Sequence, residues 1–566
     1  MTAVGHTIAY RSTPVTAVTP PRTGRAAQFW GELAEPVTGR RVPGTVPVAI
    51  VAGLVSLVAS AYLVASGLNL AYGDARAHLT IARRLFDTIS NPGLGQLGTV
   101  WLPAPHVLLA PFVAWLPAWQ SGWGAAALGA ACLAATASAL FRAAARLGLG
   151  RAGRLVAPAV VVLNPAILYL SSTALTEPVL IAAVACSVAG LANWTTRRRR
   201  GSPGELAVFA GIPAAVAVLS RYEGWALLLA GSLLVAVMSW RRSRILARVA
   251  ADIAGFAIPP LLAIGWWLAF NWVTFHDPLA FLFGEFSANT LQAQMVADGL
   301  TTKGSLGSTL ATLNTAVVGS VGPALPVLAG LALVLVVLTG RSFARLGIVA
   351  VAAVTYAFMF VSLYTGQAVI LNAVDATGSV WNNRYGASVV LALALVVAWG
   401  VDAAATLARS RGWARLVPAA VAAVVAGALV GQLAWVLESP ASRSLVLYEA
   451  VAQYDGSAAP RQAAAWLGAH YCGGMILMDE SVAQNSVLPW AGIPLNQYYL
   501  RSTDKLFDGA LADPAAHVRW VWVSAGDAAA SDKVATMITA SSTFHLDYVA
   551  AFTNEAVTIY RLADGS

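Results

Sequence analysis

A carboxylate, a guanidinium and an imidazole follow the first long apolar run of the chain within a few residues of one another. They belong to Asp74, Arg76 and His78, at the start of the stretch from Tyr72 to His106. A charge at the edge of a membrane is costly unless it is paired or used, so this cluster favours a functional site. Asp74 is also a good helix N-cap, because its carboxylate can accept backbone N–H groups. Both roles are open for Asp74, and they do not exclude each other.

Other residues that could do chemistry lie in the connections between later apolar runs. They are His106, Glu177, Arg221, Glu223, His276, Arg384 and Tyr385. Each has a simpler alternative. Glu177 could cap a helix, and Arg221 could pair with Glu223 in a turn. His276 belongs to a turn-forming sequence, and Arg384 could reach lipid headgroups.

The composition places these residues in a membrane protein. Of 566 residues, 58% are hydrophobic and 11% are charged, whereas roughly a quarter of a soluble chain is charged. The net charge of +9 does not indicate nucleic acid, because the arginines cluster between the apolar runs, which is a signal of membrane topology. The three cysteines, Cys132, Cys186 and Cys472, provide neither a disulfide framework nor a metal quartet.

The apolar runs predict a polytopic α-helical membrane protein with about eleven transmembrane helices. The helix that begins near Asp74 and the stretch Pro105–Trp119 are taken as interfacial or re-entrant helices of the first outer loop. With this count the inner segments hold 22 basic and five acidic residues, and the outer side holds 13 basic and 21 acidic residues. That is the positive-inside pattern, and it places the candidate residues on the outer side.

Three parts are expected along the chain. Residues 1–47 are polar and rich in Pro, Thr and Arg, which predicts a disordered cytoplasmic tail. Residues 48–437 form the transmembrane domain, and residues 438–566 form a small extracytoplasmic α/β domain with a linker at Gly456–Pro460. An outer polar cluster roofed by such a domain describes an extracytoplasmic active site or binding cavity.

The order of these segments resembles that of the polytopic GT-C glycosyltransferases. This superfamily uses polyprenyl-phosphate sugars and includes protein O-mannosyltransferases and lipid A aminoarabinose transferases. The likeness lies in a first span, an outer Gly-Asp-Ala…His helix and a Pro-bounded amphipathic stretch. The matching short motifs are Gly73-Asp74-Ala75, Asn164-Pro165, Thr176-Glu177-Pro178, Ser220-Arg221-Tyr222-Glu223-Gly224 and Asn383-Arg384-Tyr385. Members often carry two acids in the first outer loop, whereas Asp74 stands here without a second one.

The resemblance implies an inverting transfer of a sugar from a lipid phosphate to an acceptor hydroxyl, as in cell-envelope glycan, glycolipid or glycoprotein synthesis. Asp74 would be the catalytic base, a role worth typically about 10²–10⁴ in rate. Arg384 and Arg221, with Arg76 behind them, would bind the donor phosphate. The expected contacts to sugar or acceptor are His78, Glu177, Glu223, Tyr385, His106 and His276.

The expected partners are a polyprenyl-phosphate sugar, carrying mannose or another glycosyl unit, a glycan, lipid or protein acceptor, and membrane lipids. The sequence leaves open whether a divalent metal is a cofactor, because it offers no acidic pair to hold one. No metal ligand is assigned. The expected location is the plasma membrane, crossed several times, with the N-terminus cytoplasmic and the C-terminal domain and active site extracytoplasmic.

Two other functions are compatible with an outer polar cluster. A transporter or flippase of a lipid-linked sugar would place charges at mid-span depth and broken helices at symmetric positions. A membrane scaffold whose outer domain binds wall polymers would not need Asp74.

Overall fold

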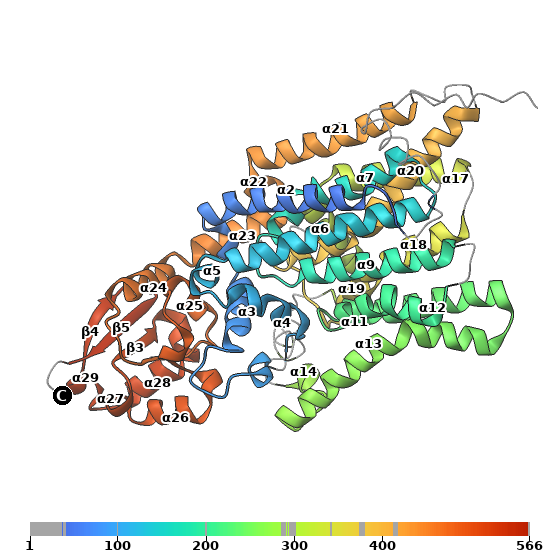
Figure 1. Ribbon diagram of the computed structural model, residues 1–566. Coiled ribbons are helices and arrows are strands. Elements are labelled where there is room, and N and C mark those ends of the chain that lie inside the picture. The colour runs from blue at the N-terminus through green and yellow to red at the C-terminus, as the bar shows by residue number, and fades with distance from the viewer. Residues whose placement is uncertain are drawn as a thin grey trace, which may run out of the picture.

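A bundle of long helices carries a smaller, sheet-containing part at one end in the computed structural model of the chain (Figure 1). The structure describes residues 37, 41–98, 100–197, 201–284, 290, 293, 302–339, 342–372, 380–410 and 417–563. The predicted tail of residues 1–47 lies almost wholly outside these residues, and its disorder therefore stays a prediction.

Seven helices of the described residues are long and apolar enough to cross a membrane, which makes the chain a multi-pass membrane protein. They are α2 (Thr45–Ala65), α6 (Trp123–Arg146), α9 (Glu177–Thr196), α12 (Glu223–Ser243), α13 (Leu246–Phe275), α20 (Val390–Ser410), which continues the 3-10 segment η5 (Asn383–Val389), and α21 (Val417–Glu438). Two bent helix pairs raise the number to nine if each pair is one span. The pairs are α16 (Leu306–Val321) with α17 (Ala324–Thr339), bent by 105°, and α18 (Phe343–Ala352) with α19 (Val354–Thr365), bent by 45°.

The predicted count of eleven is not confirmed, because two of the predicted spans are short or broken. The first is divided into α7 (Arg151–Val162) and α8 (Pro165–Leu170), since a new helix begins at Pro165. The second consists of α10 (Pro203–Leu206), a π-helical segment η4 (Ala207–Gly211) and α11 (Ile212–Val218). Each lacks the unbroken ~20 residues that a span requires.

The two most enclosed long helices, α9 and η5–α20, begin at the site described below. Both are apolar on nearly all sides and are largely buried by their neighbours, as expected of helices inside a bundle. α9 packs between α6 and α11, and α20 packs between α7 and α17. Polar residues at the starts of these helices, Glu177 and Arg384, are therefore held by a rigid, fully packed framework.

Short helices fill the connection between α2 and α6, which the sequence analysis took as the first outer loop and which lies between the bundle and the sheet (Figure 1). They are η1 (Leu68–Leu70), α3 (Gly73–Arg84), η2 (Leu94–Leu97), α4 (Ala104–Leu109), η3 (Ala110–Val113) and α5 (Leu116–Ser121). None of these loop helices is long enough to cross a membrane, as the sequence predicted. The short helix α14 (Ala280–Phe283) follows α13 in a later loop.

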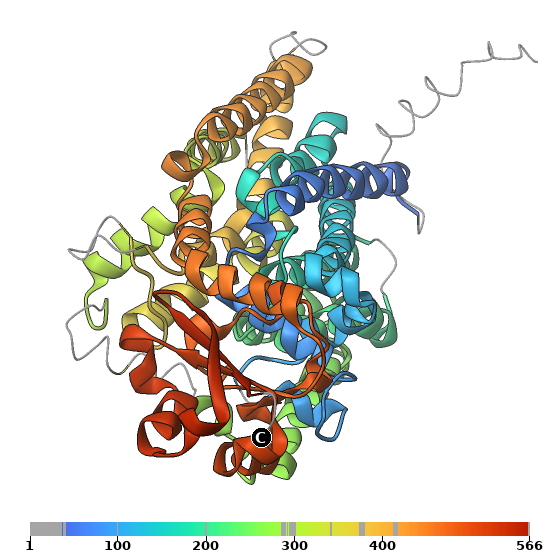
Figure 2. The same ribbon diagram turned by 90° about the vertical axis from the view of Figure 1, so that its left-hand side faces the viewer.

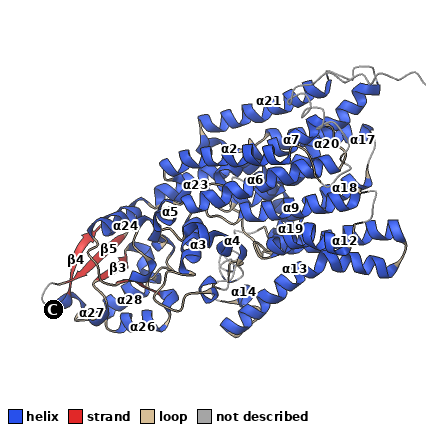
Figure 3. Ribbon diagram, in the orientation of Figure 1, coloured by secondary structure: helices blue, strands red, loops and turns tan. Residues whose placement is uncertain are grey.

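The C-terminal part contains a five-stranded sheet with helices around it (Figures 2 and 3). The strand order is β2 (Tyr498–Leu500), β1 (Ile476–Met478), β3 (Trp520–Ser524), β5 (Val557–Leu562), β4 (Tyr548–Thr553). β1 pairs in parallel with β2 and β3, whereas β5 pairs antiparallel with β3 and β4. The helices α22 (Pro440–Arg443) and α23 (Leu445–Gly456) lie against the bundle and lead into this part. The helices around the sheet are α24 (Ala458–His470), α25 (Leu488–Ala491), α26 (Lys505–Ala512), α27 (Pro514–His517), α28 (Lys533–Ala540) and α29 (Phe544–Asp547).

The predicted linker at Gly456–Pro460 is wrong. α23 ends at Gly456 and α24 begins at Ala458, so Ser457 is the whole connection between them. The small residues of this stretch pack in a tight helix–helix junction instead of forming a flexible tether.

Candidate active site

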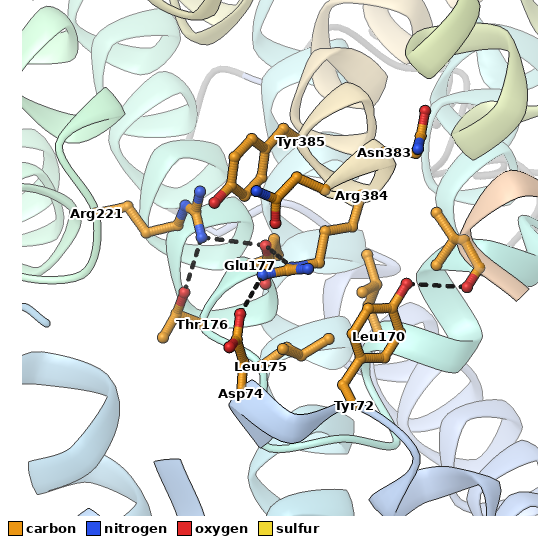
Figure 4. Close-up of polar contacts among 12 residues, drawn as sticks. Tyr72, Asp74, Leu170, Leu175, Thr176, Glu177, Arg221, Asn383, Arg384 and Tyr385 are labelled. Carbon is orange, nitrogen blue, oxygen red and sulfur yellow. Dashed lines mark hydrogen bonds and ion pairs between the residues drawn. The ribbon is translucent and has the colours of Figure 1, made fainter. Parts of the chain in front are cut away.

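The guanidinium of Arg384 is the centre of a buried ion-pair cluster at the start of α3 and α9 (Figure 4). Its Nη2 lies 2.5 Å from Asp74 Oδ2, its Nε lies 3.1 Å from Glu177 Oε1, and its Nη1 lies 3.5 Å from Glu449 Oε1. The Arg384 side chain is only 4% exposed. Every edge of this planar cation thus faces a carboxylate, an arrangement that suits the forked donors of arginine.

Arg221 is a second guanidinium that shares one of these carboxylates. Its Nη1 lies 3.1 Å from Glu177 Oε1, the same oxygen that Arg384 contacts, and its Nε lies 2.9 Å from Glu223 Oε1. The ring of Tyr385 lies beside both cations, 4.6 Å from the Arg221 guanidinium and 5.3 Å from that of Arg384. We call Asp74, Glu177, Arg221, Glu223, Arg384 and Glu449 the two-arginine cluster.

Local sequence explains how the carboxylates reach the cluster. Asp74 is the second residue of α3, and Glu177 and Glu223 are the first residues of α9 and α12. A carboxylate in the first turn of a helix is stabilised by the positive end of the helix dipole. No side-chain cap is formed at the start of α3, so Asp74 does not cap that helix and is available to Arg384.

Arg384 is presented by an unusual turn. Asn382, just before η5, has a left-handed conformation with φ 61°, which asparagine tolerates better than most residues. Gly386 follows, and a Cβ at that position would lie 2.4 Å from the carbonyl oxygen of Ala316 on α16. Glycine is needed there because the turn packs directly against the backbone of α16.

Exposure differs sharply among the carboxylates around Arg384. The Asp74 side chain is 43% exposed, whereas those of Glu177 and Glu449 are 3% and 1% exposed. The cluster is therefore reached from solvent at the Asp74 side. Glu177 Oε2 is buried and has no hydrogen-bond partner among the described residues, so one acceptor atom is left for another molecule.

Burial and charge together set the protonation of the cluster. Burial raises the pKa of Glu449 to about 7, although Arg384 and the backbone N–H groups of Asn382 and Asn383 oppose that shift. Burial alone would lower the pKa of Arg221, but Glu223 and Glu177 outweigh it and hold that pKa above its usual value. Arg221 therefore stays charged, whereas Glu449 exchanges its proton near neutral pH.

Comparison with solved structures finds a likeness over most of the chain. ArnT from Cupriavidus metallidurans bound to undecaprenyl phosphate superposes with a TM-score of 0.56 at 14% identity, over 90% of this chain and 98% of that chain. The chain has a GT-C-like fold. The apo structure of the same ArnT gives a TM-score of 0.47 at 13% identity, over 86% of this chain and 92% of that one. No family model matches the sequence, and no curated protein matches it.

Within this GT-C-like fold, Arg76 lies outside the two-arginine cluster. Its side chain points towards the C-terminal part, where Nε donates to the Ser486 carbonyl at 2.5 Å and the guanidinium lies 4.1 Å from the Trp490 ring centre. Its Nη1 donates to the carbonyls of Leu70 and Ala71. Burial lowers the pKa of Arg76 to about 10, which still leaves it charged at neutral pH.

Two of the predicted histidines bond to each other; burial lowers the pKa of His78, and the nearby charges of Arg384 and Arg221 lower that pKa further. His78 Nδ1 and His106 Nε2 are 2.8 Å apart and share a hydrogen bond that joins α3 to α4. Both rings are buried, and burial lowers the pKa of His78 to about 3 and that of His106 well below its usual value. His276 is exposed and ends α13 in a left-handed conformation, with φ 60°.

Glu449 is the cluster residue that the sequence analysis missed. It lies on α23, beyond the predicted end of the transmembrane domain, and reaches Arg384 across 65 residues of chain. The one local signal is that a carboxylate stands on the apolar face of a short helix, three residues after the buried Val446. Such a charge must be paired or used.

The described residues contain no group of three or more His, Cys, Asp or Glu side chains that could hold a metal ion. The carboxylates of the two-arginine cluster are instead directed at guanidinium groups.

Proposed function

We propose that this protein is an inverting glycosyltransferase that moves a sugar from a polyprenyl-phosphate lipid to a hydroxyl group of an acceptor. The observation that carries the proposal is the buried Arg384 guanidinium, one of whose carboxylate partners, Asp74, is accessible. Guanidinium groups bind phosphate oxygens strongly. The GT-C-like fold supports the same reading, because the similar ArnT structure is bound to undecaprenyl phosphate.

The donor phosphate takes the place of Asp74 on Arg384. Of the three ion pairs of Arg384, the one with Asp74 costs least to open, because its carboxylate can return to water, whereas Glu177 and Glu449 are buried. Opening that pair leaves the Asp74 carboxylate free beside the bound donor. Phosphate binding thus releases Asp74 from Arg384, so that its carboxylate can act as the base.

Asp74 then accepts the proton of the acceptor hydroxyl. The acceptor oxygen forms a bond to the anomeric carbon of the sugar, and the bond from that carbon to the phosphate oxygen breaks. The electron pair leaves with the polyprenyl phosphate, whose new negative charge is stabilised by Arg384 and Arg221. Attack opposite the leaving phosphate inverts the configuration of the anomeric carbon.

The remaining polar groups orient the sugar. Glu177 Oε2, which has no hydrogen-bond partner among the described residues, is the acceptor for one sugar hydroxyl, and Glu223 and Tyr385 lie beside the same two arginines. The positive-inside distribution supports a plasma-membrane enzyme with a cytoplasmic N-terminus and an extracytoplasmic active site and C-terminal domain. Membrane lipids surround the bundle, and the acceptor is a glycan, a lipid or a protein of the cell envelope.

The experiment is transfer of radiolabelled sugar by the purified protein from a panel of synthetic polyprenyl-phosphate sugars, with and without chelator. The Asp74→Asn variant is expected to lower kcat by about 10²–10⁴. Asp455→Asn is the matched control, because Asp455 is an exposed acid on α23. Full transfer by folded Asp74→Asn would remove Asp74 as the base. Donor binding without transfer from any lipid would favour the flippase or the scaffold.

A further inference from the structure

Helix α23 lies where the bundle, the first outer loop and the sheet-containing part meet. It begins just after α22, packs against α16, η5, η1 and α8, and passes through Ser457 into α24. Its residues Val446, Glu449 and Gln453 contact two separate segments of the active site. These residues are spaced by three and four positions, so they share one face of the helix.

Glu449 holds the turn that presents Arg384. Its Oε1 accepts the Asn382 N–H at 3.1 Å and its Oε2 accepts the Asn383 N–H at 3.3 Å, in addition to the Arg384 ion pair. Asn382 is the left-handed residue of that turn. A strained turn persists only where its surroundings determine it, and a buried carboxylate on two successive amides does so.

Gln453 holds the segment that presents Asp74. Its Oε1 accepts the N–H of Gly73, the residue before Asp74, at 3.0 Å, and its Nε2 donates to Glu449 Oε1 at 3.3 Å. Two turns back on α23, the Val446 carbonyl accepts the hydroxyl of Tyr72 at 3.0 Å. The start of α3 is therefore tied to the same helix as the Arg384 turn.

We infer that Glu449 and Gln453 are positioning residues, through which α23 sets the distance between the base Asp74 and the phosphate-binding Arg384. The inference rests on the proposed function, because these roles of Asp74 and Arg384 come from it. Neither residue needs to touch the substrate: Glu449 acts through the Asn382–Arg384 turn and Gln453 acts through Gly73.

The two substitutions therefore have different kinetic effects. Glu449→Ala removes the acceptor of two backbone amides, so Arg384 is misplaced and the donor KM rises by about tenfold. Gln453→Leu frees Gly73, so Asp74 is misplaced and kcat falls by about tenfold while the donor KM changes little. Asp455→Asn, on the same helix but exposed, changes neither.

Glu449→Gln separates position from charge. Glutamine keeps Oε1, which makes three of the four contacts of Glu449, and replaces only Oε2, the acceptor for Asn383. Loss of a negative charge beside Arg384 by itself favours an anionic donor. An increased donor KM in Glu449→Ala but not in Glu449→Gln is therefore the signature of positioning, which a general loss of folding would not produce.

The experiment combines donor kinetics with hydrogen–deuterium exchange on the full chain in detergent. Faster exchange is expected over residues 382–386 in Glu449→Ala and over residues 73–76 in Gln453→Leu, with Asp455→Asn like the native protein. Unchanged exchange and unchanged kinetic constants in both variants would overturn the inference. If the native protein transfers no sugar, the proposed function fails, while the exchange data still decide whether α23 holds both segments.

Discussion

At the scale of single residues, the geometry around Arg384 requires arginine specifically. Its Nη2, Nε and Nη1 atoms face three different carboxylates, two of them buried. A lysine ammonium is a compact charge without this planar fork. It can serve one or two of the three carboxylates and cannot contact all of them.

Arg384→Lys is therefore expected to be far from conservative. We expect kcat/KM for the donor to fall by about 10²–10³, since breaking a buried ion pair of Arg384 costs about 3–5 kcal/mol and distorts the site. Arg443→Lys is the control, because Arg443 contacts the exposed Glu438 on the surface. Steady-state transfer with both variants is the measurement, and equal donor kcat/KM in the two would contradict the role given to Arg384.

A pH dependence is also expected at this scale. The Glu449 pKa of about 7 means that its carboxyl is mostly protonated at pH 6 and mostly ionised at pH 8. Ionisation adds a negative charge beside the guanidinium that binds the donor phosphate. The donor KM should therefore rise by up to about tenfold as pH increases through 7. A change of one unit in the Glu449 pKa on donor binding corresponds to ~1.4 kcal/mol, which is a tenfold change in affinity.

Glu449→Gln tests this expectation, since glutamine does not titrate. Its donor KM should be flat between pH 6 and 8. His78 and His106 do not interfere, because burial holds the pKa of each below this range. A native KM that is equally flat would show that Glu449 does not exchange its proton near the donor site.

At the scale of elements, α3 serves two surfaces at once. Asp74 on its first turn faces Arg384, while Arg76 two residues later faces the C-terminal part and His78 bonds to α4. Positions i and i+2 of a helix point in different directions, so one short helix can contact both the two-arginine cluster and the C-terminal part. The sequence analysis had placed Arg76 behind Arg384 and Arg221 as a phosphate-binding candidate.

Arg76→Met separates those two roles. Methionine keeps much of the side-chain length but leaves the carbonyls of Leu70, Ala71 and Ser486 without their donor. We expect a loss of about 2 kcal/mol or more in stability, because each buried carbonyl left unpaired costs about 1–3 kcal/mol. The midpoint of thermal unfolding should fall while the donor KM stays within about twofold. A large rise in donor KM at unchanged stability would return Arg76 to the phosphate site.

Much of the element arrangement could be predicted because apolar runs and arginine clusters are local signals. Seven predicted spans correspond to long helices and one to the bent pair α18–α19, whereas the span predicted at Val321–Leu338 covers only α17 of the other pair. The polar motifs at Glu177, Arg221 and Arg384 do meet. The breaks at Pro165 and in the π-helical segment after Leu206 were harder to foresee. Both segments stay apolar across the break, so hydropathy alone runs through them.

At the scale of the whole molecule, the C-terminal part completes the site, and this could not be predicted. Glu449 has no local motif, and its partners are Arg384 and the amides of Asn382 and Asn383, far away in the chain. The linker expected at Gly456–Pro460 suggested a flexible connection to a domain outside the membrane. The observed junction is a single residue, and the domain is docked by polar contacts that only the folded chain assembles.

Asp87 makes the most demanding of these docking contacts. Its carboxylate lies 2.7 Å from Arg83 Nε and also accepts the backbone N–H groups of Leu495 and Asn496, which come from the C-terminal part. Arg83 and Asp87 are both buried. One acid of the connection between α2 and α6 therefore neutralises a buried arginine and binds the loop before β2 at the same time.

Asp87→Ala should loosen the C-terminal part while the bundle stays intact. The buried Arg83 loses its carboxylate and two amides lose their acceptor, which costs about 3–5 kcal/mol. We expect faster hydrogen–deuterium exchange over residues 493–500, unchanged exchange in α9 and α20, and reduced transfer, because α23 is joined to the same part through Ser457. Asp508→Asn, an exposed acid on α26, is the control. If exchange over residues 493–500 stays at the native rate, the Asp87 contacts are not needed to hold the C-terminal part. The remaining contacts of α23 and α25 then hold it against the site by themselves.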